Sequence, residues 1–200
     1  MPLIRRDVAK LALLALLGPA GPVMNRAQAA PAVKTLMFPT AHDWVPNNPR
    51  LPVLIYPQAI AVQGSDPAAL FESTFKRNGW PPQWRYGVFD YHHYHTQGHE
   101  VLGVFSGQAR LMLGGPGGEE VQVSAGDVLL LPAGTGHRNL GSSTDFQVVG
   151  AYPPGQQGNI CRQAPTPAQR AAIAALPFPD HDPVQGAHGA VARYWVPSRA

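Results

Sequence analysis

The chain has 200 residues, which is enough for one domain with a substantial hydrophobic core. Its 21 glycines and 22 prolines favour many turns and short strands over a helical bundle. The formal net charge is +3, but residues 30–200 contain 11 basic and 11 acidic side chains. A nearly neutral domain offers no electrostatic footprint for nucleic acid or for an anionic membrane surface, because such binding depends on clustered lysines and arginines.

Residues 1–29 are predicted to be a removable export signal. Arg5 and Arg6 are followed by DVAK, then by an apolar run at 11–17 and a small-residue cleavage site at 27–29. This pattern resembles a twin-arginine signal. The apolar run is much shorter than the roughly 18 to 20 residues of a membrane-spanning helix. We therefore expect a periplasmic or secreted protein without stable membrane insertion.

Residues 30–200 are predicted to form a single domain, with a core at about 85–152 and an arm at each end. Two short strands are expected first, at 33–38 and 51–56. A helix is expected at 65–77, because an N-cap residue and a proline open it and an Asn-Gly pair ends it.

Beyond this helix, short apolar runs alternate with turn residues every eight to twelve positions. The expected strands are 86–95, 99–106, 109–113, 121–123, 127–131 and 145–152. The GGPGG run at 114–118 is predicted to be a hairpin turn. A second helix is expected at 166–176 and a closing strand at 190–195. This spacing is typical of an all-β sandwich or barrel with a few short flanking helices.

Four of the eight histidines lie in the stretch YHHYHTQGHE at 91–100. If this stretch is a strand, His93 and His95 point to the same face, because side chains alternate between faces. A carboxylate from Glu100 and a third imidazole from a distant segment would complete a site of three histidines and one carboxylate. His137, which follows the loop PAGTG, is the candidate for the third imidazole.

These residues fall in two stretches that resemble the paired motifs of the cupin family. The first is GVFDYHHYHTQGHEVLGVFSG at 87–107, and the second is GDVLLLPAGTGH at 126–137. The first matches the family spacing in full, the second matches it from Gly126 to His137, and the two stand in the expected order. The asparagine that usually ends the second motif is replaced by Gly141, and Asn139 stands two positions earlier.

The resemblance implies a double-stranded β-helix, the jelly-roll form of an antiparallel barrel, in a single-domain cupin. It also implies that His93, His95, Glu100 and His137 are the ligands of one divalent transition metal. The stretches NGWPPQWRYGVFDYHHYHTQGHEVLGV and VVGAYPPGQ are similar to a group of small bacterial cupins without an assigned activity. Because cupins commonly dimerise through sheet edges, a homodimer is expected.

The ligand set does not select among Mn, Fe, Co, Ni, Cu and Zn. Twin-arginine signals are associated with proteins that fold before export. A weakly binding ion such as Mn or Fe would then be held in the site before the protein meets Cu or Zn outside. We therefore expect Mn or Fe.

The leading hypothesis is a metal-dependent enzyme, of the oxygenase or decarboxylase type, that acts on a small oxygen-rich molecule. An isomerase would use the same ligands. The alternative is a non-catalytic cupin that binds or stores a metal or a small ligand. A general acid or base beside the metal would distinguish the two, and His99, Tyr91 and Arg85 are the candidates. A metal-free structural barrel is disfavoured because all four ligand types stand at full spacing.

Overall fold

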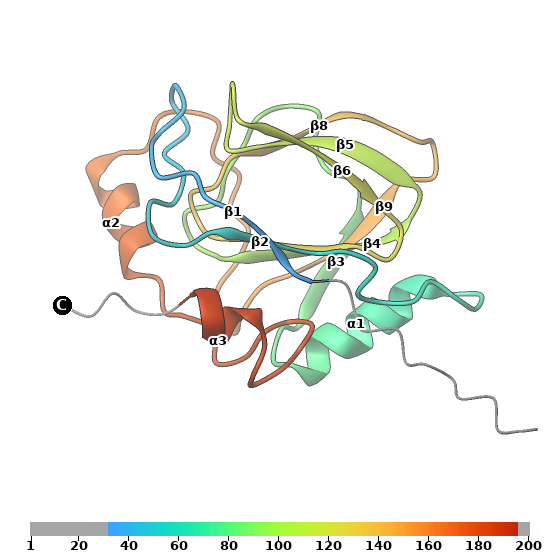
Figure 1. Cartoon of the computed structure of the whole chain (residues 1–200). Coiled ribbons are helices and arrows are strands. Elements are labelled where there is room, and N and C mark those ends of the chain that lie inside the picture. The colour runs from blue at the N-terminus through green and yellow to red at the C-terminus, as the bar shows by residue number, and fades with distance from the viewer. Residues whose placement is uncertain (1–31, 196–200) are drawn as a thin grey trace, which may run out of the picture.

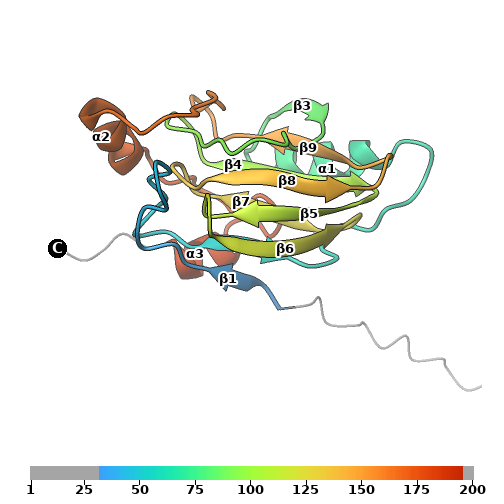
Figure 2. The ribbon, with the colours of Figure 1, turned by 90° about the horizontal axis from the view of Figure 1, so that it is seen from above.

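The protein is described by a computed structural model that covers residues 32–195, so the export signal predicted at 1–29 lies outside the described residues. Within this range the chain forms two antiparallel sheets that face each other (Figure 1). The larger sheet has the order β1 (Lys34–Leu36), β2 (Val53–Tyr56), β7 (Val128–Leu131), β4 (Glu100–Ser106), β9 (Gln147–Ala151) and β3 (Pro82–Tyr86). The smaller sheet has the order β6 (Glu119–Ser124), β5 (Gln108–Leu113) and β8 (His137–Ser142). Figure 2 shows the smaller sheet lying over the larger one.

Three helices flank the sheets: α1 (Pro67–Arg77), α2 (Pro167–Ala175) and α3 (Ala190–Tyr194). Helices α1 and α3 lie against the outer face of the larger sheet, and α2 lies near one end of the barrel (Figure 1). No helix among residues 32–195 combines the length and the apolar character needed to cross a membrane. The architecture confirms the predicted all-β jelly roll with a few short helices.

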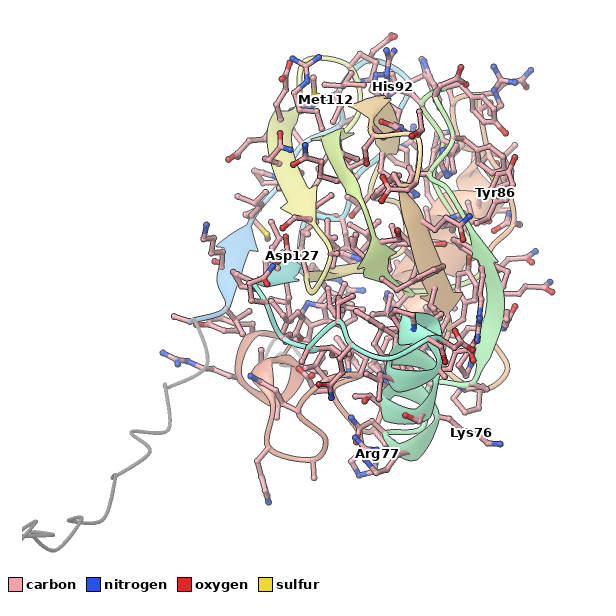
Figure 3. All side chains as sticks on the ribbon, turned by 90° about the vertical axis from the view of Figure 1, so that its right-hand side faces the viewer. Lys76, Arg77, Tyr86, His92, Met112 and Asp127 are labelled. Carbon is pink, nitrogen blue, oxygen red and sulfur yellow. The ribbon has the colours of Figure 1, made fainter. Side chains whose placement is uncertain are left out.

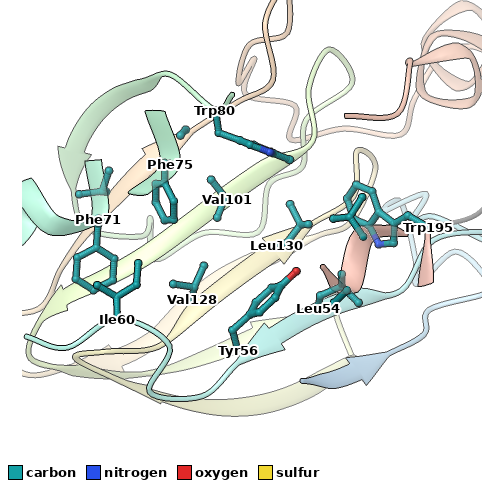
Figure 4. Packing of buried hydrophobic residues seen from close by; sticks show 14 of the residues in the cluster. Leu54, Tyr56, Ile60, Phe71, Phe75, Trp80, Val101, Val128, Leu130 and Trp195 are labelled. Atoms are coloured by element: carbon teal, nitrogen blue, oxygen red, sulfur yellow. The ribbon is translucent and has the colours of Figure 1, made fainter. Parts of the chain in front are cut away.

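The central strands of the larger sheet are buried on both faces, and this explains their continuous apolar runs. In β7, Leu129 and Leu131 face the smaller sheet, where they join the core between the two sheets. Val128 and Leu130 point the opposite way and pack with the residues of α1 and α3 (Figure 4). All four side chains are therefore buried, as expected for a central strand covered on each side.

Helix α1 supplies much of the outer core. Its apolar side chains Ala68, Phe71 and Phe75 recur at helical spacing and are fully buried. They pack directly on β4 at Gly103, where a Cβ would overlap the rings of Phe71 and Phe75. The helix therefore lies close to the sheet because β4 carries a glycine at the point of contact.

Two predicted strands are wrong. The chain leaves the larger sheet at the end of β3, and residues 87–92 are irregular. This segment crosses to the edge of the smaller sheet, where His93 forms an isolated bridge with His137. The alternation of aromatic and polar residues at 86–95 therefore reflects a crossing between sheets rather than one long strand.

The closing strand predicted at 190–195 is helix α3. Its buried residues Ala190 and Val191 are followed at helical spacing by Trp195, which closes the outer core and donates from Nε1 to Pro52 O at 2.9 Å. The spacing of one turn between these apolar residues suits a helix lying on a sheet. The strands β3 and β8 were not predicted, because their sequences PQWRY and HRNLGS lack an apolar run.

Candidate metal centre

Three buried imidazoles meet where the two sheets are joined at one end of the barrel. The nitrogens of His93, His95 and His137 that could bind a metal all lie within 4.8 Å of one another. The backbones of His93 and His137 pair in both directions, with N to O distances of 3.2 and 2.9 Å. This antiparallel bridge sets their rings side by side, with centroids 4.1 Å apart. His95 lies two residues beyond His93 and therefore projects to the same side.

Each imidazole is oriented by a backbone carbonyl. The Nδ1 atoms lie 3.1 Å from Tyr91 O for His93, 2.7 Å from Asn159 O for His95 and 3.2 Å from Thr135 O for His137. With the proton on Nδ1 donated to the carbonyl, the Nε2 lone pair of each ring is available to a metal. The three carbonyls therefore favour the tautomer in which Nε2 can bind a metal.

Glu100 adds a carboxylate to this cluster. It is the first residue of β4, it is 2% exposed, and its Oε2 lies 3.2 Å from Nε2 of both His95 and His137. Its other oxygen, Oε1, accepts a hydrogen bond of 2.5 Å from the hydroxyl of Tyr152. The carboxylate is therefore fixed with one oxygen toward the imidazoles and the other toward the tyrosine.

The pKa shifts of His93 and Glu100 favour metal binding, whereas the charge and hydrogen bond of Glu100 outweigh burial and raise the pKa of His95. Burial, with smaller contributions from the neighbouring His137 and His95, lowers the pKa of His93 to about 2. Burial alone would raise the pKa of Glu100, but the charges and hydrogen bonds of His95 and His137 outweigh it and hold that pKa well below its ordinary value. At neutral pH His93 is neutral and Glu100 is ionised, which are the forms that bind metals.

The cluster opens onto a cavity of about 360 Å³. Besides His93, His95, His137 and Glu100, the residues that line it are Trp84, Arg85, Tyr86, Gly87, Val88, Phe89, Leu102, Tyr152, Gly158 and Ile160. A small organic molecule of ordinary size fits such a volume. The four candidate ligands therefore lie on the wall of a cavity and are not enclosed in the core.

Of the three acid, base or anchoring candidates, Arg85 lines the cavity but is engaged elsewhere. Its guanidinium lies 2.9 Å from Asp66 and 2.6 Å from Glu72, and it forms hydrogen bonds with both carboxylates. The salt-bridge role that is usual for an arginine at the end of a strand is the one observed.

Tyr91 and His99 lie near the cluster, and neither is among the described residues that line the cavity. The ring of Tyr91 stacks on Phe89, with centroids 4.9 Å apart, and meets His93 edge to face. His99 is buried and its Nδ1 accepts a hydrogen bond of 3.0 Å from Ala133 N. Both residues therefore contact neighbouring groups and do not line the cavity.

Tyr152 is the residue at this site that the sequence reasoning missed. Tyr152 is the first residue after β9. Val148 of that strand faces the core between the two sheets, and Tyr152 lies four residues beyond Val148. Strand alternation places residues 148, 150 and 152 on the same face. This alternation in VVGAYPPGQ is the sequence signal that could have placed the side chain of Tyr152 inside the barrel.

The metal-free protein is expected to lose stability as the pH falls from about 6.5 to 4, and His99 is one cause. Burial, with a smaller contribution from Arg50, lowers the pKa of His99 to about 4. Between these pH values the unfolded state binds a proton that the folded state does not, so stability falls by about 3 kcal/mol and then levels off. His99→Asn keeps an acceptor for Ala133 N and should reduce this loss.

The measurement is the free energy of unfolding in denaturant at pH 7 and pH 4.5, in the presence of a chelator. His188→Asn, at an exposed histidine, is the matched control and should leave the pH dependence unchanged. Equal pH dependence in wild type and His99→Asn would contradict the prediction.

Comparison with known proteins places this site in a family. The Cupin domain family matches residues 85–149. The uncharacterized protein YjlB of Bacillus subtilis (strain 168) is 36% identical over 165 residues, which cover 82% of this chain and 96% of YjlB. A DUF861 family protein of Thermotoga maritima, solved by crystallography, is 17% identical with a TM-score of 0.30, over 49% of this chain and 96% of that one.

Streptomyces albus HEPD, solved with 2-hydroxyethylphosphonate and Fe(II), is 15% identical with a TM-score of 0.25, over 76% of this chain and 24% of that one. The two structural likenesses are weak, whereas YjlB matches along nearly its whole length. The two motifs, the jelly-roll sheets and the histidine cluster agree with this relationship. The chain therefore belongs to the cupin superfamily, as a small single-domain cupin with a histidine cluster suited to a divalent metal.

Proposed function

We propose that this cupin is a metal-dependent enzyme, of the oxygenase or decarboxylase type, that acts on a small oxygen-containing molecule. The observation that supports this proposal is the position of the histidine cluster on the wall of a cavity of about 360 Å³. Structural metal sites are closed by their protein ligands, whereas catalytic sites keep a position open for substrate. A metal that only braced the barrel would not need a cavity beside it.

His93, His95 and His137 would hold the ion through Nε2, and Glu100 would hold it through Oε2. A divalent ion bound there acts as a Lewis acid that polarises an oxygen atom of the substrate. At neutral pH His93 is neutral and Glu100 is ionised, so neither of these two ligands holds a proton that competes with the metal.

Tyr152 joins the site as the group that positions Glu100, because burial and the neighbouring Glu100 raise the pKa of its hydroxyl far above the ordinary value and make it a poor acid. Its hydroxyl lies at the cavity and donates to Glu100 Oε1. Leu102 and Val88 line the same space.

The test is turnover by metal-loaded protein. Small hydroxy acids, keto acids and diols are incubated with the protein, with and without dioxygen, and substrate loss and oxygen uptake are measured. Glu100→Gln should abolish turnover, while Glu119→Gln, at an exposed glutamate of β6, should leave it unchanged. Binding of these compounds to the loaded site without turnover of any of them would overturn the enzymatic proposal and favour the non-catalytic alternative.

A further inference from the structure

We propose that the ligand of this cavity carries a flat, uncharged apolar body, such as an aromatic ring, joined to the oxygen group that reaches the metal. This inference rests on the proposed function in one respect, because it takes the metal as the anchor for the oxygen group. It concerns the rest of the ligand, for which the walls of the cavity provide the contacts.

An indole forms part of the wall. Trp84 of β3 is partly buried and lies against Gly150 of β9, where a Cβ would overlap the indole ring. Its Nε1 donates to the hydroxyl of Tyr152 at 3.4 Å, so the polar edge of the ring is already engaged. Any side chain at position 150 would displace the indole, so the glycine allows this ring to lie flat along the sheet.

The other wall residues are apolar as well. Val88, Phe89, Leu102 and Ile160 line the cavity together with Trp84. Apart from Arg85 and the exposed Tyr86, the polar side chains at the cavity lie at the metal end, where the hydroxyl of Tyr152 is already bound to Glu100. A ligand therefore meets most of its polar partners at one end and mainly hydrocarbon along its remaining length.

The cavity has no free positive charge for a second acidic group on the ligand. Histidines aside, Arg85 is the one basic residue among the described residues that line it, and Asp66 and Glu72 both bind its guanidinium. A carboxylate or phosphate at the far end of the ligand would lose water without gaining an opposite charge, and this is costly. The walls therefore favour a body without charge.

The apolar surface continues to the mouth of the cavity. Tyr86 is 63% exposed and Ile160 is 46% exposed, and both line the cavity. Figure 3 shows Tyr86 projecting at the outer edge of the molecule. Its ring lies near that of Phe89, with centroids 6.1 Å apart. Exposed apolar side chains at the mouth of a site are typical of ligand contact.

Benzohydroxamate and acetohydroxamate share one metal-binding group and differ in their apolar part. Comparing their affinities therefore isolates the contribution of the aromatic ring. We expect calorimetry to show that Co(II)-loaded protein binds benzohydroxamate at least tenfold more tightly than acetohydroxamate. Trp84→Ala should remove this preference. Trp44→Ala is the matched control, since Trp44 packs with Tyr94 in a separate apolar cluster, and it should keep the preference.

A second pair of hydroxamates tests whether the part of the ligand away from the metal can carry a charge. 4-Carboxybenzohydroxamate should bind at least tenfold more weakly than 4-methylbenzohydroxamate, which has a similar size. Equal affinities within either pair, or failure of the metal-loaded protein to bind any hydroxamate, would overturn the inference. These outcomes differ from failure of the proposed function, which would appear as ligand binding without turnover.

Discussion

Replacing His93 and His137 together by alanine is expected to abolish metal binding. The change removes two of the three imidazoles whose nitrogens lie within 4.8 Å of one another, and it leaves His95 paired with Glu100. Elemental analysis of the purified protein should find one ion per chain in the wild type and none in the variant. An ion present at 100 times its dissociation constant stabilises a protein by about 2.7 kcal/mol, so added metal should raise the Tm of the wild type alone.

The control for this experiment is His188→Ala, because His188 is exposed and lies outside the cluster. It should keep both the metal and the metal-dependent rise in Tm. A double variant that folds cooperatively and still binds one ion per chain would show that these histidines are not the ligands. The same analysis identifies the metal. Mn or Fe is expected, and Zn or Cu alone would contradict the argument from loading before export.

Tyr152→Phe is expected to weaken metal binding by about 10-fold to 100-fold, which is the usual effect of removing a group that orients a metal ligand. The hydroxyl of Tyr152 holds Glu100 Oε1, and this contact keeps Oε2 directed at His95 and His137. Without it the carboxylate can rotate. Chelator competition would measure the affinity, and the absorption spectrum of the Co(II) form would report a change in coordination.

Tyr56→Phe is a matched control within the same chain. The hydroxyl of Tyr56 donates to the carboxylate of Asp182 at 2.6 Å, and this buried pair lies on the helix-covered face of the larger sheet. Both variants lose a buried hydrogen bond to a carboxylate, which costs about 1 to 3 kcal/mol of stability. Only Tyr152→Phe should change the Co(II) spectrum. An unchanged spectrum and affinity in Tyr152→Phe would mean that Tyr152 does not position Glu100.

The local pattern of the chain was sufficient to predict much of the barrel. The strand at 127–131, the hairpin turn at 114–118 and the helices at 65–77 and 166–176 are all present. Turns and helix ends depend on neighbouring residues, such as the positive φ of Gly114, so short stretches of sequence predict them well. The prediction of a strand at 190–195 was wrong because the conformation of this segment depends on the sheet that it covers.

The candidate site likewise has features that the sequence predicts and features that depend on the tertiary structure. The two motifs were enough to indicate that His93, His95, Glu100 and His137 converge, because strand alternation and family spacing are properties of the sequence. The partners of Tyr152 and Arg85 were not accessible from it, since each lies far along the chain: Tyr152 binds Glu100 across 52 residues, and Arg85 binds Asp66 across 19.

The apolar wall is also a tertiary feature. Trp84 and Gly150 become neighbours only when β3 pairs with β9, and the sequence does not reveal which indole will face a cavity. Hydrogen bonds and packing between distant segments are decided by how the two sheets close on each other. The sequence therefore predicts the kind of metal site, whereas the folded chain determines which side chains orient its ligands and which surfaces a bound molecule meets.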